Sequence, residues 1–292
     1  MFAENITAYF DNYLYAAVPV LIVAMFVGAL WHLLNRITPF DDHKELFDKN
    51  NFAYAVQRIA LLAAQVIGML HVLEYSIEKD GLNAVFWMVA EGAWVFVVLL
   101  AVRPVVDRIV LRRINNLQRL LDRDISTGIV EAGFYIGLGV LLNGSLDGSA
   151  PTVATGLAST VVFGLLGLAV VIAVFYLHEV FTPYNLQQHL EERKVTAAIE
   201  VAALLIAVSI VVRTGVAGVF TTWQAGFAGF FATVVFTVPT LYLFRWLIDR
   251  FVLTNCTVRS IQANNQVVAA LVLGALLITV AVPIQLALNL HL

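Results

Sequence analysis

Carboxylates inside long apolar segments are the residues of this sequence with the clearest chemical potential. Glu131 and Glu200 lie about six or seven residues into two such segments, and Glu91 lies about eight residues into a third. A carboxylate at this depth in lipid is costly, so it should face protein or water, where it often marks an ion or proton pathway. Aligning the segments places Gln57 at the corresponding position of an earlier one. We therefore predict a candidate intramembrane pathway of Glu131, Glu200, Glu91 and Gln57.

Two structural interpretations of these carboxylates stay open beside the pathway. The helices could begin earlier than the apolar runs suggest, so that the side chains only reach the interface. Alternatively, each carboxyl group could be neutral and hydrogen-bonded across a contact between helices. Glu131 and Glu200 are the stronger pathway candidates, because Glu91 has no counterpart at an aligned position.

The sequence contains no pattern that predicts an enzyme, a cofactor or a metal site. It lacks a Gly-rich phosphate loop, a His-Glu-x-x-His helix and a Ser nucleophile elbow. Its one cysteine, Cys256, can form neither an internal disulfide nor a metal site alone. His32, His71 and His178 are interpreted as packed or interfacial side chains. We expect no nucleic-acid binding, since the basic connections are short and close to lipid.

The composition is that of an α-helical membrane protein. The mean hydropathy is +0.87, and charged residues make up 13% of the chain, against about 25% in soluble domains. Apolar runs of about 20 residues are long enough to cross a bilayer, where backbone polar groups must be paired within a helix. We predict eight transmembrane helices, at about 15–36, 53–74, 83–103, 126–146, 155–178, 195–216, 225–248 and 264–288.

The chain repeats itself. Thr38-Pro39-Phe40 returns as Thr182-Pro183-Tyr184, and Arg103 with Asp107 returns as Arg245 with Asp249. The sequence therefore predicts two four-helix membrane repeats, 1–150 and 151–292. Each repeat divides again into two pairs of spans joined by a polar connection. Because each pair crosses the membrane an even number of times, the units are parallel and not inverted.

Basic residues predict the orientation. Fourteen of the 17 Lys and Arg residues fall in the connections 36–52, 103–125, 179–194 and 245–263. The positive-inside tendency places these connections in the cytoplasm and both termini outside it. If residues 103–124 form a helix, its apolar and basic residues separate onto different faces, as in a helix at the headgroup level. These residues give a candidate surface for a cytoplasmic partner or anionic lipid: Arg108, Arg112, Arg113, Arg119 and Arg123.

The order of a span, Thr-Pro, a short polar segment and an Ala-rich span resembles the YjfL-like bacterial inner-membrane family of unknown function. This chain is similar to two such units in tandem. The resemblance implies a bacterial inner-membrane location and an association with membrane-stress proteins, and it implies no catalytic residue.

Two functional hypotheses follow. The first is a membrane-stress or envelope-associated scaffold that recruits a cytoplasmic partner or lipid. The second is a channel or transporter for protons or small cations that uses the intramembrane carboxylates. Small-residue faces such as Gly133-x-x-x-Gly137 also allow close helix packing, either within one chain or in a homo-oligomer.

Overall fold

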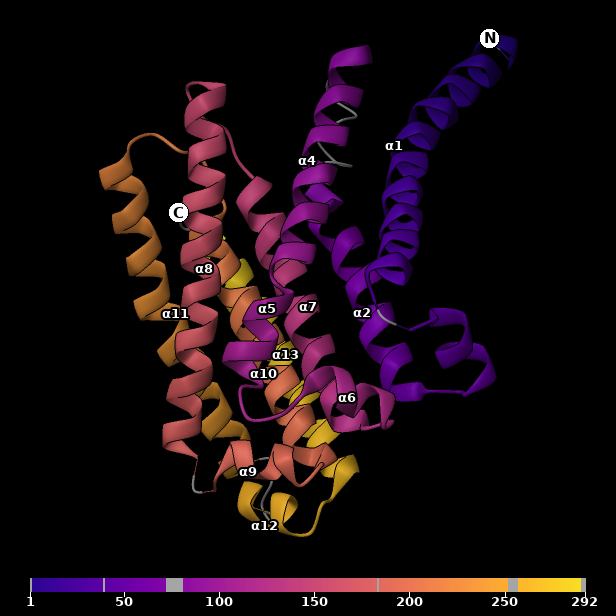
Figure 1. Cartoon of the computed structure of the whole chain (residues 1–292). Helices are drawn as coiled ribbons and strands as arrows, with labels where there is room; N and C mark the ends of the chain where they lie inside the picture. The colour runs from indigo at the N-terminus through magenta and orange to yellow at the C-terminus, as the bar shows by residue number, and fades with distance from the viewer. Residues whose placement is uncertain (1, 39, 72–80, 183, 252–256, 290–292) are drawn as a thin grey trace.

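The computed structural model describes residues 2–38, 40–71, 81–182, 184–251 and 257–289 (Figure 1). Every regular element in these ranges is a helix. The long helices are α1 (Phe2–Ile37), α2 (Phe52–Gly68), α4 (Gly81–Ala101), α7 (Ile125–Leu146), α8 (Val153–Phe181), α10 (Val195–Val216), α11 (Trp223–Phe251) and α13 (Val267–Asn289). The short ones are η1 (Lys44–Asp48), α5 (Arg103–Val105), η2 (Val106–Val110), α6 (Asn116–Leu121), α9 (Leu186–Glu191) and α12 (Val258–Ala263).

The described residues contain seven helices that are long and apolar enough to cross a membrane, and α2 is a shorter apolar helix. The chain is therefore a multi-pass helical membrane protein. The predicted second span, 53–74, agrees with α2 over its described part and then runs into residues outside the described ranges. Cys256 also lies outside them.

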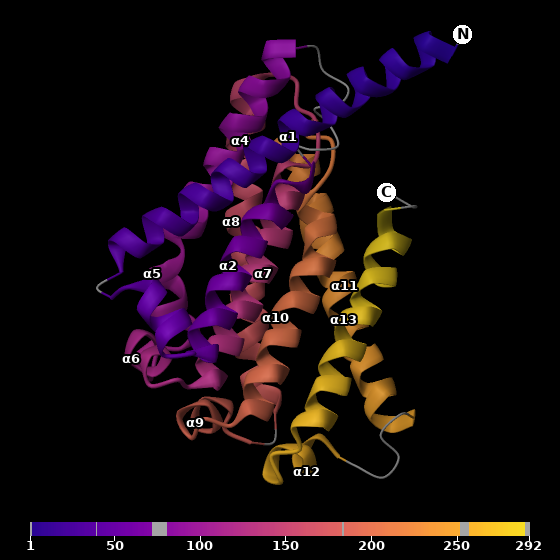
Figure 2. The same cartoon turned by 90° about the vertical axis from the view of Figure 1, so that its right-hand side faces the viewer.

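The helices form two rows. In the inner row α2 packs on α7, α7 on α10, and α10 on α13, so the four lie side by side (Figure 2). In the outer row α4 contacts α2 and α7, α8 contacts α7 and α10, and α11 contacts α10 and α13, while α1 contacts α2 and α4. The pairs α1/α2, α4/α7, α8/α10 and α11/α13 are thus laid next to one another like successive repeats.

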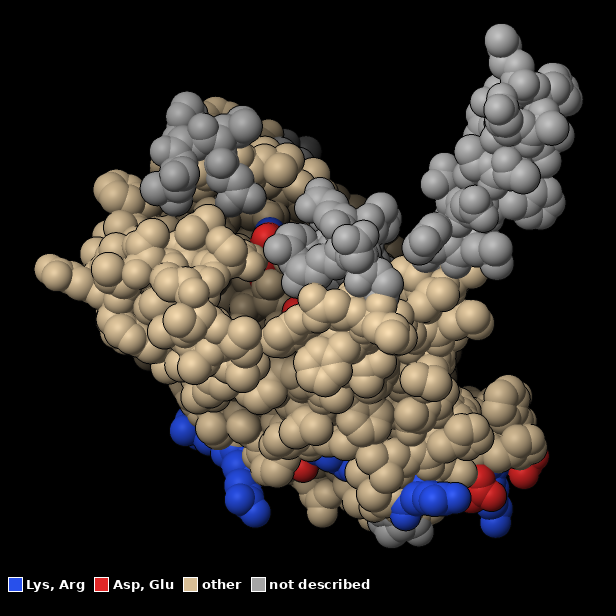
Figure 3. All heavy atoms as spheres, turned by 90° about the horizontal axis from the view of Figure 1, so that it is seen from above, with Lys and Arg blue, Asp and Glu red and all other residues tan. Residues whose placement is uncertain are grey.

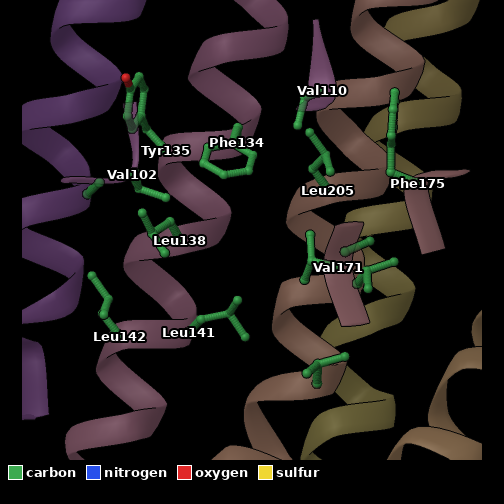
Figure 4. Close-up of a cluster of buried hydrophobic side chains, with 14 of the residues drawn as sticks. Val102, Val110, Phe134, Tyr135, Leu138, Leu141, Leu142, Val171, Phe175 and Leu205 are labelled. Atoms are coloured by element: carbon green, nitrogen blue, oxygen red, sulfur yellow. The ribbon is translucent and has the colours of Figure 1, made fainter. Parts of the chain in front are cut away.

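Small residues let the inner helices approach closely. A Cβ atom built at Gly133 on α7 would lie 2.4 Å from the Cα of Ala202 on α10. Gly139 on α7 meets Ala64 on α2 in the same way. Such contacts supply much of the packing energy between helices in lipid. Around them, buried Phe, Leu and Val side chains fill the space between α7, α8 and α10 (Figure 4).

Each inner helix begins in the same manner. The residues Asn50, Arg123, Arg193 and Asn265 all have positive φ angles, between 48° and 61°, and the helix starts two residues later. Counting from these residues gives a common register for the four helices. Gln57 and Glu200 then lie seven residues into their units, but Glu131 lies eight. The predicted equivalence of Glu131 and Glu200 is therefore off by one residue, about 100° around a helix.

The connection 103–124 is two short helical segments and not one helix. The α5–η2 segment ends at Leu111, whose φ of −110° and ψ of 42° leave the helical region. A new helix, α6, then begins under the Asn115 side chain, which accepts a hydrogen bond from the backbone N–H of Gln118. This N-cap satisfies a donor that a continuous helix would have paired internally, so the break costs little.

The packing predicts the effect of filling the α7–α10 contact. We expect Gly133→Leu to lower the free energy of unfolding by about 1–3 kcal/mol or more, because backbone would have to move to admit the side chain. Thermal unfolding in detergent, followed by tryptophan fluorescence, measures this. Gly229→Leu on α11 is the matched control, since an added Cβ there meets nothing within 4 Å. Equal melting temperatures for the two variants would contradict the close α7–α10 packing.

Candidate functional site

Glu200 is the centre of a buried polar cluster. His178 Nε2 lies 3.2 Å from its Oε1 atom, and Arg245 donates to the same oxygen. Its Oε2 atom accepts hydrogen bonds from the Tyr184 hydroxyl and, at 2.7 Å, from Gln262 Nε2. We call these five residues the Glu200 cluster. Its polar groups come together from α8, α10, α11, α12 and the segment before α9.

The other four residues of the cluster all contact the Glu200 carboxylate. An ionised carboxylate offers about four lone-pair sites, and four side chains occupy or face them here. Burial and the charge of Glu200 raise the pKa of Tyr184, so this phenol stays a hydrogen-bond donor. A cavity of about 30 Å³, lined by Glu200, Arg245, Asp249 and Gln262, lies beside the carboxylate. It has room for about one water molecule.

The first half of the chain has different polar residues at the positions equivalent to the Glu200 cluster. Gln57 stands where the second half has Glu200, and Arg103 stands where it has Arg245. The carboxylate is supplied instead by Glu131 on α7, which is buried and interacts with Gln57, Arg58, Arg103 and Asp107. No ion pair within 4 Å involves Glu131 among the described residues. The buried carboxylate therefore lies on α7 in the first half and on α10 in the second half.

A second buried ion pair was not predicted from the sequence. Arg58 Nη2 on α2 lies 2.8 Å from the Oδ1 atom of Asp42, and both side chains are almost fully buried. The Tyr54 hydroxyl donates to the same Asp42 oxygen, and the Arg58 guanidinium lies 4.7 Å from the centre of the Tyr54 ring. The signal was Arg58 itself, because an arginine in an apolar helix requires a partner.

Of the four predicted pathway residues, the structure brings together Glu131 and Gln57, whereas Glu200 and Glu91 lie elsewhere. On α7, Gly128 and Gly139 face α2 while Gly133 faces α10, and Glu131 interacts with α2. Glu200 turns instead toward α8, α11 and α12. Between the two, Gly133 and Ala202 are in close contact. Glu91 lies apart from both, at a cavity near the other end of the molecule.

That cavity, the outer cavity, opens at the end opposite α6, α9 and α12. It has a volume of about 1160 Å³ and lies between α4, α8, α11 and the adjoining turns. Figure 3 looks into it, and acidic and basic atoms are visible at its depth. Asp147 lines it and pairs with Arg213 at 2.8 Å and with His71 at 3.5 Å. Two further lining groups, Trp94 Nε1 and Thr214 Oγ1, are buried without a hydrogen-bond partner among the described residues.

The predicted basic surface divides into two groups. Arg108, Arg112, Arg113 and Arg123 are exposed. Arg119 is half-buried and binds within the protein, to Asp124 Oδ2 at 3.1 Å and to the carbonyl oxygen of Glu191 at 2.9 Å. Although burial alone would raise the pKa of Asp124, hydrogen bonds from Ser126, Arg119 and Thr127 hold it below its usual value.

Comparison with known proteins agrees with the repeat. The model of a family described as a domain of unknown function, DUF350, matches residues 6–146 and again residues 152–288. The two matches cover most of the chain, which therefore belongs to the DUF350 family. They bear out the tandem repeat of a family of unknown function that the sequence resemblance implied. No curated protein and no solved structure matches the chain.

The Glu200 cluster makes a prediction about coupling. Glu200→Gln leaves the buried Arg245 without its counter-charge, so we expect it to destabilise the protein by about 3–5 kcal/mol. The double variant Glu200→Gln/Arg245→Gln removes both charges and should be less destabilised than the sum of the single variants. Thermal unfolding of all four proteins gives the coupling. Additive losses of stability would show that Glu200 and Arg245 have no interaction energy with each other.

Proposed function

We propose that this DUF350 protein is a non-enzymatic scaffold of the bacterial inner membrane that binds anionic lipid headgroups at its cytoplasmic face. The end that carries α6, α9 and α12 is taken as cytoplasmic, with both termini on the other side. Four arginines are exposed near this end, whereas Lys and Arg side chains are scarce over the opposite face in Figure 3. The positive-inside tendency supports this orientation.

The observation that carries the proposal is that the connections at this end are bonded to one another. Asn51, the N-cap of α2, donates to the Leu120 carbonyl of α6 at 2.8 Å. Arg119 of α6 donates to the Glu191 carbonyl of α9, and Thr196 at the start of α10 donates to Gln262 of α12 at 2.9 Å. The short helices α6, α9 and α12 are therefore each fixed to a neighbouring unit. Together they form a layer that holds the exposed arginines in place.

Arg108 and Arg112 are the best placed for lipid. Neither forms an ion pair with a described residue, and Arg112 lies over the Tyr176 ring, 5.3 Å from its centre. Arg108 lies in η2, at the end of the apolar span Leu82–Val110, and Arg112 follows that span, so both lie near the headgroup level. A basic residue there contributes about 1 kcal/mol of attraction to an anionic leaflet. An acidic cytoplasmic protein of the membrane-stress kind could use the same charges, and the lipid experiment below separates the two.

The hydrogen bonds of the buried Glu200 carboxylate support a non-enzymatic role. Glu200, a carboxylate with several polar neighbours, already has its lone pairs occupied by the protein. The cavity beside it has room for about one water molecule. Such a cluster positions helices and leaves no reactive atom free for chemistry.

The lipid proposal predicts a charge-dependent affinity. In nanodiscs of phosphatidylcholine with increasing phosphatidylglycerol, Arg108→Gln/Arg112→Gln should weaken phosphatidylglycerol retention by about 30-fold, from about 1 kcal/mol per residue. Native mass spectrometry of the released protein counts the bound lipids.

The control is Arg113→Gln/Arg193→Gln, whose guanidinium groups already face Glu191 and Asp122 at 3.7 Å and 3.6 Å. It should change retention much less. Equal retention by all three proteins would reject lipid binding at this surface, and an acidic protein partner would then be the remaining candidate.

A second candidate function is conduction of protons or small cations, and the outer cavity favours it. The cavity reaches Thr233 on α11. Below it, Thr237, Leu241 and Arg245 follow at intervals of four residues on the same helix face, and Arg245 binds Glu200. Leu241 is buried and interrupts this polar line. Such an apolar constriction is a way in which channels are gated.

Conduction makes its own prediction. Replacing the constriction, in Leu241→Ser, should raise proton flux into proteoliposomes severalfold, because water can then bridge Thr237 and Arg245. A pH-sensitive dye inside the vesicles reports the flux. Leu243→Ser, at an exposed position of the same helix, should not change it. Flux at the level of protein-free vesicles in every variant would remove this candidate.

A further inference from the structure

We propose that copies of this chain associate side by side, with α13 of one copy packed against α2 of the next. The inner row would then continue from chain to chain. This inference is independent of the lipid-binding and conduction proposals, because it rests only on how the inner helices pack.

The inner helices use positions on one common stripe each time they pack on the following helix. Counted from the residue with positive φ, the contacts lie at position 3 on α2 (Ala53), at positions 10 and 14 on α7 (Gly133 and Gly137), and at positions 6 and 10 on α10 (Ile199 and Ala203). These positions lie along one stripe of an α-helix. We call this stripe the forward face.

The helix that follows is contacted on another common stripe, the backward face. It includes position 5 on α7 (Gly128), positions 9 and 16 on α10 (Ala202 and Ser209), and position 9 on α13 (Gly274). Gly139 on α7 adds position 16 again. Three successive seams therefore have one geometry, although the residues that make them differ.

The two ends of the row leave these faces unpaired. The forward face of α13, at positions 3, 6, 10, 14 and 21, is exposed at every residue: Val268, Leu271, Ala275, Thr279 and Leu286. The backward face of α2 includes Ile59, which is 66% exposed, and it is half-buried elsewhere: Ala55, Leu62 and Val66. Leu70, just past the end of α2, is 44% exposed. Neither face carries a charge that would oppose burial against another helix.

An interface already present in the chain shows how the two faces would meet. The α7–α10 seam joins the two DUF350 units, and in the second unit α13 corresponds to α7, while in the first unit α2 corresponds to α10. Copying this seam between chains puts Ala275 opposite Ile59, as Gly133 is opposite Ala202. The interface between copies would thus repeat the interface between units, with somewhat larger side chains.

The start of α13 is also uncovered, at the end of the molecule that carries α6, α9 and α12. The starts of α2 and α10 are bonded to the short helix of the following unit, and α6 is bonded to α9. No further unit contacts the start of α13 among the described residues, and Asn264, Asn265 and Gln266 are exposed there. The short helix of the first unit is η1, which presents Phe47 with 64% exposure. In the proposed assembly, η1 of the next copy covers the start of α13.

The proposed contact is head to tail. Two different faces meet, so the interface is heterologous, and repetition gives a closed ring or an open chain and not a two-fold dimer. A lipid-facing role for both stripes would instead leave the chain monomeric, and the experiment separates these outcomes.

Disulfide trapping tests the contact and its direction. In a Cys256→Ser background, Ile59→Cys and Ala275→Cys are made as separate single-cysteine proteins and reconstituted alone or mixed. We expect the mixture, after oxidation, to form a cross-linked species of twice the chain mass severalfold more than either protein alone. A protein that carries both cysteines should form larger species or a closed ring.

The control pairs Ile59→Cys with Leu243→Cys, which is 54% exposed on α11 at a similar distance from the basic end of its helix. This mixture should cross-link only at the background level of random collisions. The proposal is overturned if Ile59/Ala275 and Ile59/Leu243 mixtures cross-link equally while a lipid-soluble maleimide labels all three thiols. Cross-linking of one variant with itself, above its mixture, would show a two-fold interface and overturn the head-to-tail arrangement.

Discussion

Hydrocarbon cannot solvate a charge, and this constraint determines how the charged residues of the helices are arranged. Glu200, Arg245 and Arg58 all lie within apolar helices, and each has an oppositely charged partner from a different element. Because an unpaired charge at this depth is costly, each ion pair fixes the rotation of the helices that carry it. The small-residue seams then set how closely those helices approach. Charge pairing and close packing together define the two-row arrangement.

The two halves meet this constraint differently. In the second half the carboxylate is Glu200 on α10, surrounded by donors from three neighbouring helices and the turn before α9. In the first half it is Glu131 on α7, while α2 carries Gln57 together with the separate Arg58–Asp42 pair. The repeated backbone is therefore kept, but the buried polar groups are redistributed. A residue role inferred for one half cannot be transferred to the other by sequence position alone.

Much of the fold could be predicted from the sequence, since apolar length and the repeat depend on composition and order along the chain. The predicted spans agree with most of the long helices to within a few residues. The site was harder, because its contacts join residues far apart, such as Glu200 and Gln262. The one-residue shift of Glu131 arises where α7 begins, at Arg123, and no residue type marks it. Arg119 was assigned to the surface from its charge, although backbone carbonyls of α9 bind it.

Joining the two units in one polypeptide has a further consequence. An assembly of identical single units must place the same side chain at every seam, so any change is made everywhere at once. Here the α7–α10 seam lies between halves that are free to diverge. At the equivalent position of the forward face, α7 has the smaller residue Gly133 and α13 has Ala275. In the proposed head-to-tail assembly, the junction within the chain is therefore permanent and tight while the junction between copies is exchangeable, so the number of neighbours would respond to the concentration of the protein in the bilayer.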